Sequence, residues 1–435
     1  MTNTEQTPPA AYFGSLTIEN VKCFKGEHTI DLSDGNGNPA MWTVILGNNN
    51  TGKTTLLRCL ADLEPIKKGF SPTTNFDFNK EEKYTPSNVF DFSDEWQPKI
   101  SVKPFIKFDS ITRIGCSWIF NKNVLSKHDW MFVTAASFTT FPSTKNKYIG
   151  STIIYGYGTN RRKGDIYLSG KEQDNTASLF DDNVALTNIE EWLLQIYFAK
   201  ILNKTNARTA EKIFQKVKEI LICGILPDVQ DFDFDTTDNF KGFAKFKTDY
   251  GWIKFGDLGY GYQNVTTLVV DLAKKLFERY PNSENPLHEP AIVLVDELDL
   301  HLHPEWQRKI ISFLSKQFPK TQFIATTHSP LIVQSADNIN LVILEKQDDH
   351  VIIKQPDIKT FKGWTVDEIL TELMGLDDKT LSDDYLKLIK QFDDALDNDN
   401  YQQAKNAYDE LDKILHPSSH QRKLLRIQMA SLSRD

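Results

Sequence analysis

The chain has 435 residues, of which 40% are hydrophobic and 25% are charged, and its formal net charge is −9. These values describe an ordinary globular protein that is long enough for about two to three domains. The acidic balance argues against a broadly basic surface for nucleic acid and leaves room only for a local basic patch.

The cysteines and the apolar residues indicate the compartment. The four cysteines lie far apart without a CxxC spacing, so neither a disulfide framework nor a zinc site is predicted, which fits a reducing compartment. Residues 1–10 are polar, unlike a signal peptide, and no apolar run approaches the ~18 residues that span a bilayer. We therefore expect a cytoplasmic protein with no membrane partner.

The first third of the chain predicts strands around one irregular segment. Residues 12–24 and 27–32 have the pattern of two paired strands. Residues 67–96 are rich in Asn, Asp, Lys, Pro and Phe without periodicity, which predicts an irregular, mobile insertion. Alternating apolar residues then predict antiparallel strands within 100–120 and 131–140.

The rest of the chain alternates between helical and strand patterns. A strand is expected at 152–155, and Phe residues that alternate with polar residues predict a β-meander at 231–257. The acidic residues between 377 and 399 are expected on a solvated helix face. Helical spacing of the apolar residues predicts helices at 188–203, 209–221, 265–280 and 305–317, and a helical tail at 366–434.

The segment GNNNTGKT fits the phosphate-loop pattern G-x-x-x-x-G-K-[ST]. An apolar strand, 43–46, precedes it and a helix, 55–61, follows, so backbone N–H groups and the helix dipole meet at one point. In this arrangement Lys53 reaches the β- and γ-phosphates of a nucleotide, and the Thr54 hydroxyl binds Mg²⁺. The expected nucleotide-binding residues are Gly47, Asn48, Asn49, Asn50, Thr51, Gly52, Lys53, Thr54 and Thr55.

Two carboxylates follow a second buried strand. The apolar run 292–295 ends in Asp296 and Glu297, and a helix and another apolar strand, 322–327, come next. A strand–helix–strand unit of this kind implies a parallel crossover, with ligands at the carboxyl ends of its strands. Asp296 is the expected Mg²⁺ ligand, through water, and Glu297 is the expected general base for the attacking water.

Two further motifs select one family of phosphate-loop proteins. LGYGYQ, at 258–263, has the spacing of the LSxGxQ signature, and THSP, at 327–330, has the position of a switch histidine. With the string DELDLHLHPEWQ, at 296–307, they make the chain resemble the RecF/SMC/OLD branch of the ABC-type ATPases. The resemblance covers residues 12–62 and 250–345.

The resemblance implies the fold class and the domains. We expect an α/β protein: an ABC-type P-loop NTPase head with a mixed, largely parallel sheet, an antiparallel β-subdomain, a helical insertion and a C-terminal helical region. The expected divisions are an N-terminal lobe at 1–62, an insertion at 63–250, a C-terminal lobe at 251–350 and the helical region at 351–435.

The resemblance also implies an ATP- and Mg²⁺-dependent ATPase that works as a homodimer or a higher oligomer. In this family the signature of one copy covers the ATP of the other, and the switch histidine senses the γ-phosphate. The residues at those positions are Gly259, Gly261, Gln263, His303 and His328. Gly259 replaces the usual signature serine, which removes a donor worth about 1.5–3 kcal/mol, so slow turnover or ATP held as a clamp is expected.

Other segments are similar to the ATPase subunits of bacterial anti-phage operons, mainly the Septu-type PtuA family and less closely those of PARIS systems. They are residues 155–162, 178–181, 191–193 and 363–370. This resemblance implies a separate nuclease or toxin partner of the HNH or Toprim type, because the chain itself shows neither pattern. The alternative is a DNA-binding repair ATPase of the RecF type, with DNA as its partner. A transporter ATPase is disfavoured.

Several residues have a second interpretation. His301 and His303 could bind a metal, although a role in the D-loop between the subunits is favoured. Residues 231–235 resemble a calcium loop but lack its Gly and Glu, and are expected as a strand. Arg161 and Arg162 have the pattern of a solvated loop or of a contact with nucleic acid or a second copy. Trp192 and Trp364 are expected in a core or an interface.

Overall fold

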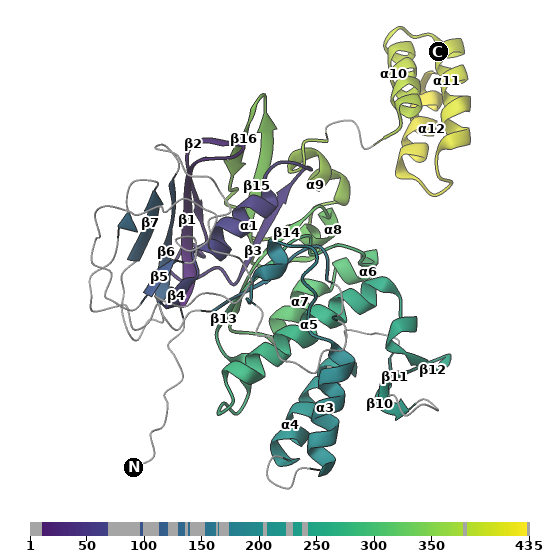
Figure 1. The fold of residues 1–435 in the computed structure, drawn as a ribbon. Coiled ribbons are helices and arrows are strands. Elements are labelled where there is room, and N and C mark those ends of the chain that lie inside the picture. Colours follow the sequence, from purple (N-terminus) through teal and green to yellow (C-terminus); the bar gives the residue numbers. More distant parts are fainter. Residues whose placement is uncertain are drawn as a thin grey trace. The chain divides into compact units, whose positions relative to one another are not determined.

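The structure is a computed structural model, and it divides into two compact units, Met1–Gly363 and Trp364–Asp435. The two units are described separately below (Figure 1). The residues that the structure describes are 11–67, 96–98, 113–120, 129–134, 138–139, 153–161, 164, 174–202, 207–222, 229–236, 242–376 and 381–432.

A six-stranded, mostly parallel sheet forms the centre of the first unit, in the order β16-β15-β3-β14-β13-β9. Every residue of β3, β13 and β14 is buried, as their continuous apolar sequences predict for parallel strands covered on both faces. The edge pair β15–β16 was not predicted. The strands are β3 (Trp42–Gly47), β9 (Ile154–Tyr157), β13 (Ala291–Val295), β14 (Thr321–Thr327), β15 (Asn340–Gln347) and β16 (His350–Lys354).

An antiparallel sheet in the order β2-β1-β6-β7-β8 accompanies the central sheet. Its first two strands confirm the predicted pair, and their buried residues share a core with helix α1 (Lys53–Asp62) and the central sheet. Most of the predicted insertion, residues 68–95, and residues 99–112 lie outside the described part of the chain. The strands are β1 (Ala11–Val21), β2 (Phe24–Asp31), β6 (Arg113–Phe120), β7 (Asp129–Thr134) and β8 (Phe138–Thr139), with a separate pair β4 (Pro65–Lys67) and β5 (Trp96–Pro98).

A helical and β-meander region leads to the signature segment. The predicted meander is confirmed as a three-stranded sheet, and the predicted helix pair packs against it through an aromatic cluster that includes Phe214, Phe232 and Tyr197. Trp192 is half-buried. The elements are α3 (Ile189–Leu202), α4 (Ala207–Ile220), β10 (Asp231–Thr236), β11 (Gly242–Thr248), β12 (Gly251–Lys254) and α5 (Tyr260–Arg279).

Two helix boundaries differ from their predictions. Helix α5 begins at Tyr260 rather than at 265, because the glycine-containing signature, a weak helix former, is itself its first turn. The helix predicted at 305–317 is two helices, α6 (Pro304–Gln307) and α7 (Ile310–Gln317). The N–H of Lys309 bonds the carbonyl of Trp306, three residues back, at 2.9 Å, and this tight turn interrupts the helix.

The second unit is a small helical bundle, as predicted for the tail. Its core includes Phe392, Leu411 and Leu425. The described acidic residues of α10 are exposed, as expected of a solvated face, and Trp364 is half-buried. No helix among the described residues is long and apolar enough to cross a membrane. The helices are α9 (Val366–Glu372), α10 (Asp383–Asp397), α11 (Tyr401–Ile414) and α12 (His420–Leu432).

Candidate functional site

The predicted motifs meet at one edge of the central sheet. Strands β3, β13 and β14 are parallel neighbours, with Val295 opposite Ala325 and Thr327 opposite Leu46. The loops that leave their carboxyl ends therefore start side by side. These loops carry the phosphate-loop motif, the Asp-Glu pair and the switch histidine.

The phosphate loop has a backbone that its glycines and one asparagine permit. Gly52 has φ of 90° and Asn50 has φ of 63°, in the left-handed region that suits these two residue types. A β carbon at Gly47 would stand 2.7 Å from the Thr51 hydroxyl oxygen and 2.9 Å from the Leu344 carbonyl oxygen. The loop is thus closely packed at Gly47 against Thr51 and Leu344, while its three asparagines, Asn48 to Asn50, are exposed.

Lys53 begins helix α1 (Lys53–Asp62) and points back over the loop. Its ammonium donates to the carbonyl oxygens of Gly47, at 2.8 Å, and Asn48, at 2.9 Å. Burial lowers the pKa of Lys53, and the carboxylates of Asp296, Glu297 and Asp299 oppose that shift. The helix has neither a side-chain cap nor an acidic residue in its first turn, so its N–H groups and Lys53 fit a phosphate chain.

Thr54 and Asp296 join the two motifs directly. The Thr54 hydroxyl donates to one carboxylate oxygen of Asp296 at 2.6 Å, and the Thr326 hydroxyl donates to the other at 2.6 Å. A hydroxyl and a carboxylate at hydrogen-bond distance form the oxygen donor set that Mg²⁺ prefers. The residues therefore fit the expected cation.

Glu297 has an unusual backbone conformation, with φ of 48°. Its N–H donates to the Thr326 hydroxyl oxygen at 2.7 Å, and its carbonyl oxygen accepts from the guanidinium of Arg161 at 2.8 Å. A non-glycine residue in this region is strained and persists where its surroundings hold it. Hydrogen bonds hold both the backbone N–H and the backbone carbonyl of Glu297 here.

His328 follows the end of β14 and is partly buried. Its backbone N–H donates to the carboxylate of Asp299 at 3.2 Å, and the same oxygen accepts from the Thr327 hydroxyl at 2.6 Å. Burial and, to a lesser extent, the nearby Lys53 ammonium lower the pKa of His328. Its imidazole is therefore neutral at neutral pH.

The signature residues lie at the start of α5. Gly259 is the N-cap, with φ of −54° and no side-chain cap, and a β carbon there would meet only Tyr262, at 3.5 Å. Gly261 differs, because a β carbon there would stand 2.2 Å from the His301 carbonyl oxygen. Gln263 donates through its side chain to the carbonyl oxygens of Leu258, at 2.7 Å, and Gly256, at 3.1 Å.

The two histidines of the H-x-H pair have separate contacts. The His303 ring accepts from the Glu305 N–H at 3.3 Å and so caps helix α6. The His301 ring packs edge-on against Tyr260, with ring centroids 4.9 Å apart. Within the described part of the chain, no group of three or more His, Cys, Asp or Glu residues could hold a metal ion. The geometry thus gives the pair no joint metal site.

Sequence reasoning missed two residues of this edge, and one of its interpretations of a third is wrong. Thr326 bonds both Asp296 and Glu297, and Asp299 bonds the segment that carries His328. Arg161 is only 4% exposed and bonds the backbone of the Asp-Glu pair, so the solvated-loop interpretation is wrong for it. Arg162 lies outside the described residues. Thr326 directly precedes the THSP motif, but its partners lie far away in sequence.

Within one chain the structure brings the phosphate loop, Asp296, Glu297 and His328 together. Gly261 instead lies close to the His301 carbonyl oxygen, and the Gln263 side chain bonds the backbone just before α5. Among the hydrogen bonds of the described residues, none joins Gly259, Gly261 or Gln263 to the phosphate loop.

Comparison with known proteins agrees with this arrangement. Residues 13–222 match the family described as "AAA ATPase domain". Residues 212–334 match an "AAA domain" family whose description includes "AbiEii toxin, Type IV TA system". The two matches together extend from the first strand to the switch-histidine segment.

Individual relatives have related names. The chain is 29% identical to the Septu protein PtuA of Bacillus thuringiensis, over 90% of this chain and 92% of that protein. It is 36% identical to the "Retron Ec83 probable ATPase" of Escherichia coli, over 33% of this chain and 26% of that protein. A solved Smc head domain with an extended coiled coil, bound to the C-terminal domain of ScpA and derived from Pyrococcus furiosus, is 15% identical, with a TM-score of 0.42, over 83% of this chain and 99% of that one.

The motifs, their meeting at one sheet edge and the family matches support one class of protein. The chain is an ATPase that resembles the ABC-type ATPases of the RecF/SMC/OLD branch. Within that branch it is similar to the Septu protein PtuA, which it matches over most of both chains.

Proposed function

We propose that this ATPase binds ATP and Mg²⁺ at the sheet edge, assembles through the bound nucleotide and thereby controls a separate nuclease or toxin subunit in anti-phage defence. The observation that carries the nucleotide site is the 2.6 Å bond between Thr54 and Asp296. This bond joins two motifs 242 positions apart, beside a buried lysine on an uncapped helix.

In this proposal the chain's own groups divide the work. The N–H groups of residues 47–55 hold the phosphates, and Lys53 exchanges its carbonyl partners for phosphate oxygens. Mg²⁺, held by Thr54 and Asp296, neutralises charge that develops on the phosphates. Glu297 accepts a proton from the attacking water, and His328 contacts the γ-phosphate.

The signature surface supports a two-copy site. A sequence that carries both a phosphate loop and a signature, with no hydrogen bond between them among the described residues, fits an assembly in which each copy covers the other's nucleotide. Gly259, Gly261, Gln263 and His303 of one copy then face the phosphate loop of the next. The N-terminus of α5 has no side-chain cap, which suits an approaching phosphate.

The relatives support the biological setting. The chain is similar to a Septu protein and to a retron ATPase, which supports an ATPase of defence systems. The nuclease or toxin partner is inferred from the resemblance and from the lack of an HNH or Toprim pattern in this sequence.

The test uses cells that carry this chain with its neighbouring genes. We expect fewer phage plaques with the intact operon than with the Lys53→Ala variant, and co-purification of a nuclease with the tagged chain. Equal plating of phage by the two strains, together with sensitivity of the variant to DNA damage, would instead favour the RecF-like repair ATPase.

A substitution at Gly259 tests the proposed contact across the interface. The backbone there has an ordinary φ of −54°, and a β carbon would meet its nearest neighbour, Tyr262, at 3.5 Å, so Gly259→Ser should fold. Its hydroxyl can cap α5 and donate to the γ-phosphate of the opposite copy, so turnover should rise.

An ATPase assay and mass photometry measure the two consequences, and Gly259→Ala is the matched control, since it adds volume without a donor. Faster turnover with an intact assembly is expected for the serine alone. Slower turnover with a dissociated assembly in both variants would show that the glycine is needed for close packing against the second copy.

A further inference from the structure

Arg161 is a buried arginine whose partners are backbone carbonyls. It is 4% exposed, and its guanidinium donates to the carbonyl oxygens of Asp296 and of Glu297, the latter at 2.8 Å. A third bond, at 3.2 Å, goes to the carbonyl oxygen of Gly158. The nucleotide chemistry described above uses Asp296 and Glu297 but assigns no task to Arg161.

Arg161 bonds the backbone of Glu297, the expected base, whose backbone conformation is strained. Glu297 has φ of 48°, and its N–H is already held by Thr326 at 2.7 Å. Arg161 holds the carbonyl on the other side of the same residue. The direction of the Glu297 side chain depends on this backbone conformation, because the Cα–Cβ bond is fixed to the backbone.

The charge of Arg161 is retained despite its burial. Burial lowers the pKa of Arg161 to about 10, and the carboxylates of Asp296, Asp299 and Glu297 oppose the shift. The guanidinium is therefore protonated at neutral pH. Burying a charge is costly unless it is well bonded, and a guanidinium, with several donors in a fixed plane, can hold neighbouring carbonyls at once.

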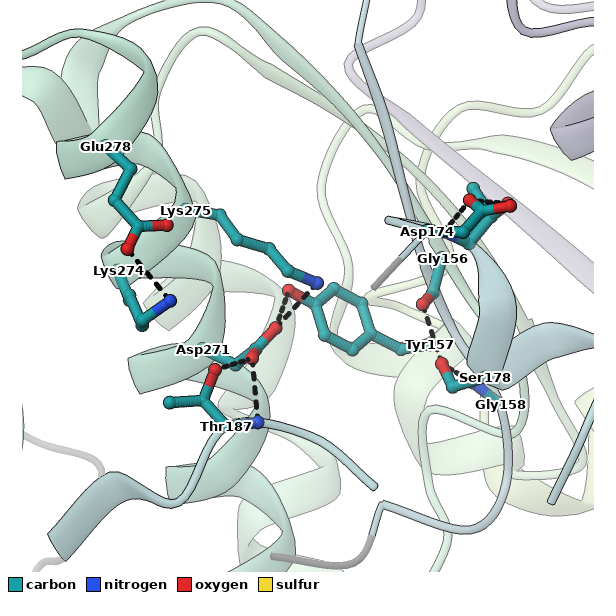
Figure 2. A network of polar contacts seen from close by, with 11 residues as sticks. Gly156, Tyr157, Gly158, Asp174, Ser178, Thr187, Asp271, Lys274, Lys275 and Glu278 are labelled. Atoms are coloured by element: carbon teal, nitrogen blue, oxygen red, sulfur yellow. Dashed lines mark hydrogen bonds and ion pairs between the residues drawn. The ribbon is translucent and has the colours of Figure 1, made fainter. Parts of the chain in front are cut away.

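The segment that carries Arg161 is itself fixed on two sides. The Tyr157 hydroxyl donates to the Asp271 carboxylate at 2.9 Å, and Asp271 also bonds Thr187 and pairs with Lys275 at 2.9 Å (Figure 2). Asp271 belongs to α5, the helix that begins with the signature. Tyr157 also accepts the N–H of Asp296 at its backbone carbonyl, at 2.8 Å.

On the other side, the Ser178 hydroxyl donates to the Gly156 carbonyl oxygen at 2.8 Å and accepts from the Gly158 N–H at 3.3 Å (Figure 2). A β carbon at Gly158 would stand 2.0 Å from the Ser178 carbonyl oxygen, so only glycine fits there. Helix α5 is therefore connected to Arg161 through the Tyr157 side chain and through a backbone segment that the Ser178 hydroxyl holds in place.

We propose that Arg161 is a positioning residue that holds Glu297 in its water-activating orientation, and that the Tyr157–Asp271 bond fixes Arg161 to the signature helix. This inference rests on the proposed role of Glu297. It predicts that losing Arg161 slows the chemical step and leaves nucleotide binding intact, because Arg161 bonds the backbone carbonyl of Asp296 rather than its carboxylate and has no hydrogen bond to the phosphate loop or to Lys53.

The experiment compares Arg161→Ala and Arg161→Lys with the parent protein in ATP affinity and in kcat. We expect an unchanged Kd for a non-hydrolysable ATP analogue and a kcat that falls about 10- to 100-fold in the alanine variant, as misplaced catalytic groups do. Lysine, which can still donate to one carbonyl, should recover part of the rate.

Arg58→Ala is the matched control, since Arg58 also donates to a backbone carbonyl, that of Leu179, at 2.6 Å, but contacts neither Asp296 nor Glu297. It should change neither constant appreciably. A loss of ATP affinity in Arg161→Lys as large as the loss of rate would overturn the positioning role.

A double-mutant cycle with Glu297→Gln separates this inference from the proposed function. If Arg161 acts through Glu297, adding Arg161→Ala to Glu297→Gln should slow hydrolysis little further. Full additivity of the two effects would refute the inference while leaving Glu297 as the base. A Glu297→Gln variant that hydrolyses ATP at the parental rate would contradict both the role of Arg161 and the proposed role of Glu297 as the base.

Tyr157→Phe keeps the proposal testable even if Arg161→Ala does not fold. It deletes one hydroxyl, and Asp271 keeps its bonds to Thr187 and Lys275. We expect a smaller fall in kcat, about 3- to 10-fold, with the Kd of the analogue unchanged. A parental kcat in both Tyr157→Phe and Arg161→Lys would contradict the proposed chain of contacts.

Discussion

Lys53→Ala should abolish measurable ATP binding. The variant removes the Lys53 ammonium, which bonds the phosphate loop, and each charge-assisted bond to a phosphate oxygen is worth about 1.5–3 kcal/mol. It also removes the donor that now bonds the Gly47 and Asn48 carbonyls, so the loop loses a support. Isothermal titration calorimetry with ATP and Mg²⁺ measures the loss.

Lys413→Ala is the control for this variant, because the Lys413 side chain is 66% exposed and pairs with Glu410 of the same helix, α11. It should bind ATP as the parent does. An ATP affinity in Lys53→Ala equal to that of the parent would show that the nucleotide site lies elsewhere.

Glu297→Gln should keep ATP bound and slow hydrolysis by about 10²-fold or more. The amide has the shape of the carboxylate and leaves the backbone bonds to Thr326 and Arg161 in place, but it cannot accept a proton from water. A single-turnover assay with radiolabelled ATP measures the chemical step separately from product release.

The control for this variant is Glu305→Gln, which neutralises a carboxylate eight positions further along that pairs with Lys309. Its rate should remain near the parental one. If Glu297→Gln and Glu305→Gln both hydrolysed ATP at the parental rate, another residue would have to activate the water.

The parts of the site that the sequence predicts are those that local chain geometry fixes. A glycine-rich loop between a buried strand and a helix, or two carboxylates after a buried strand, carries its meaning within a few residues. The parallel pairing of β3, β13 and β14 then brings Thr54, Asp296 and Thr327 to one edge without further information. The middle of the sheet and this edge could therefore be predicted, whereas the pair β15–β16 could not.

The parts that the sequence did not predict depend on contacts between distant segments. Arg161 lies four residues after the end of β9, and only the pairing of β9 with β13 shows that it reaches Glu297. Likewise, glycine does not favour a helix, but the close approach of the His301 carbonyl explains why Gly261 stands in the first turn of α5. Such contacts become visible only when the fold is known.

In the proposed function, bound ATP holds two or more copies of this chain together. Mass photometry of the Glu297→Gln variant, with and without ATP and Mg²⁺, tests this assembly, and Lys53→Ala is the control because it should not bind ATP. We predict a shift to a larger assembly on adding ATP to Glu297→Gln and no shift for Lys53→Ala. The same mass with and without ATP, in a Glu297→Gln sample shown by calorimetry to bind the nucleotide, would contradict the account.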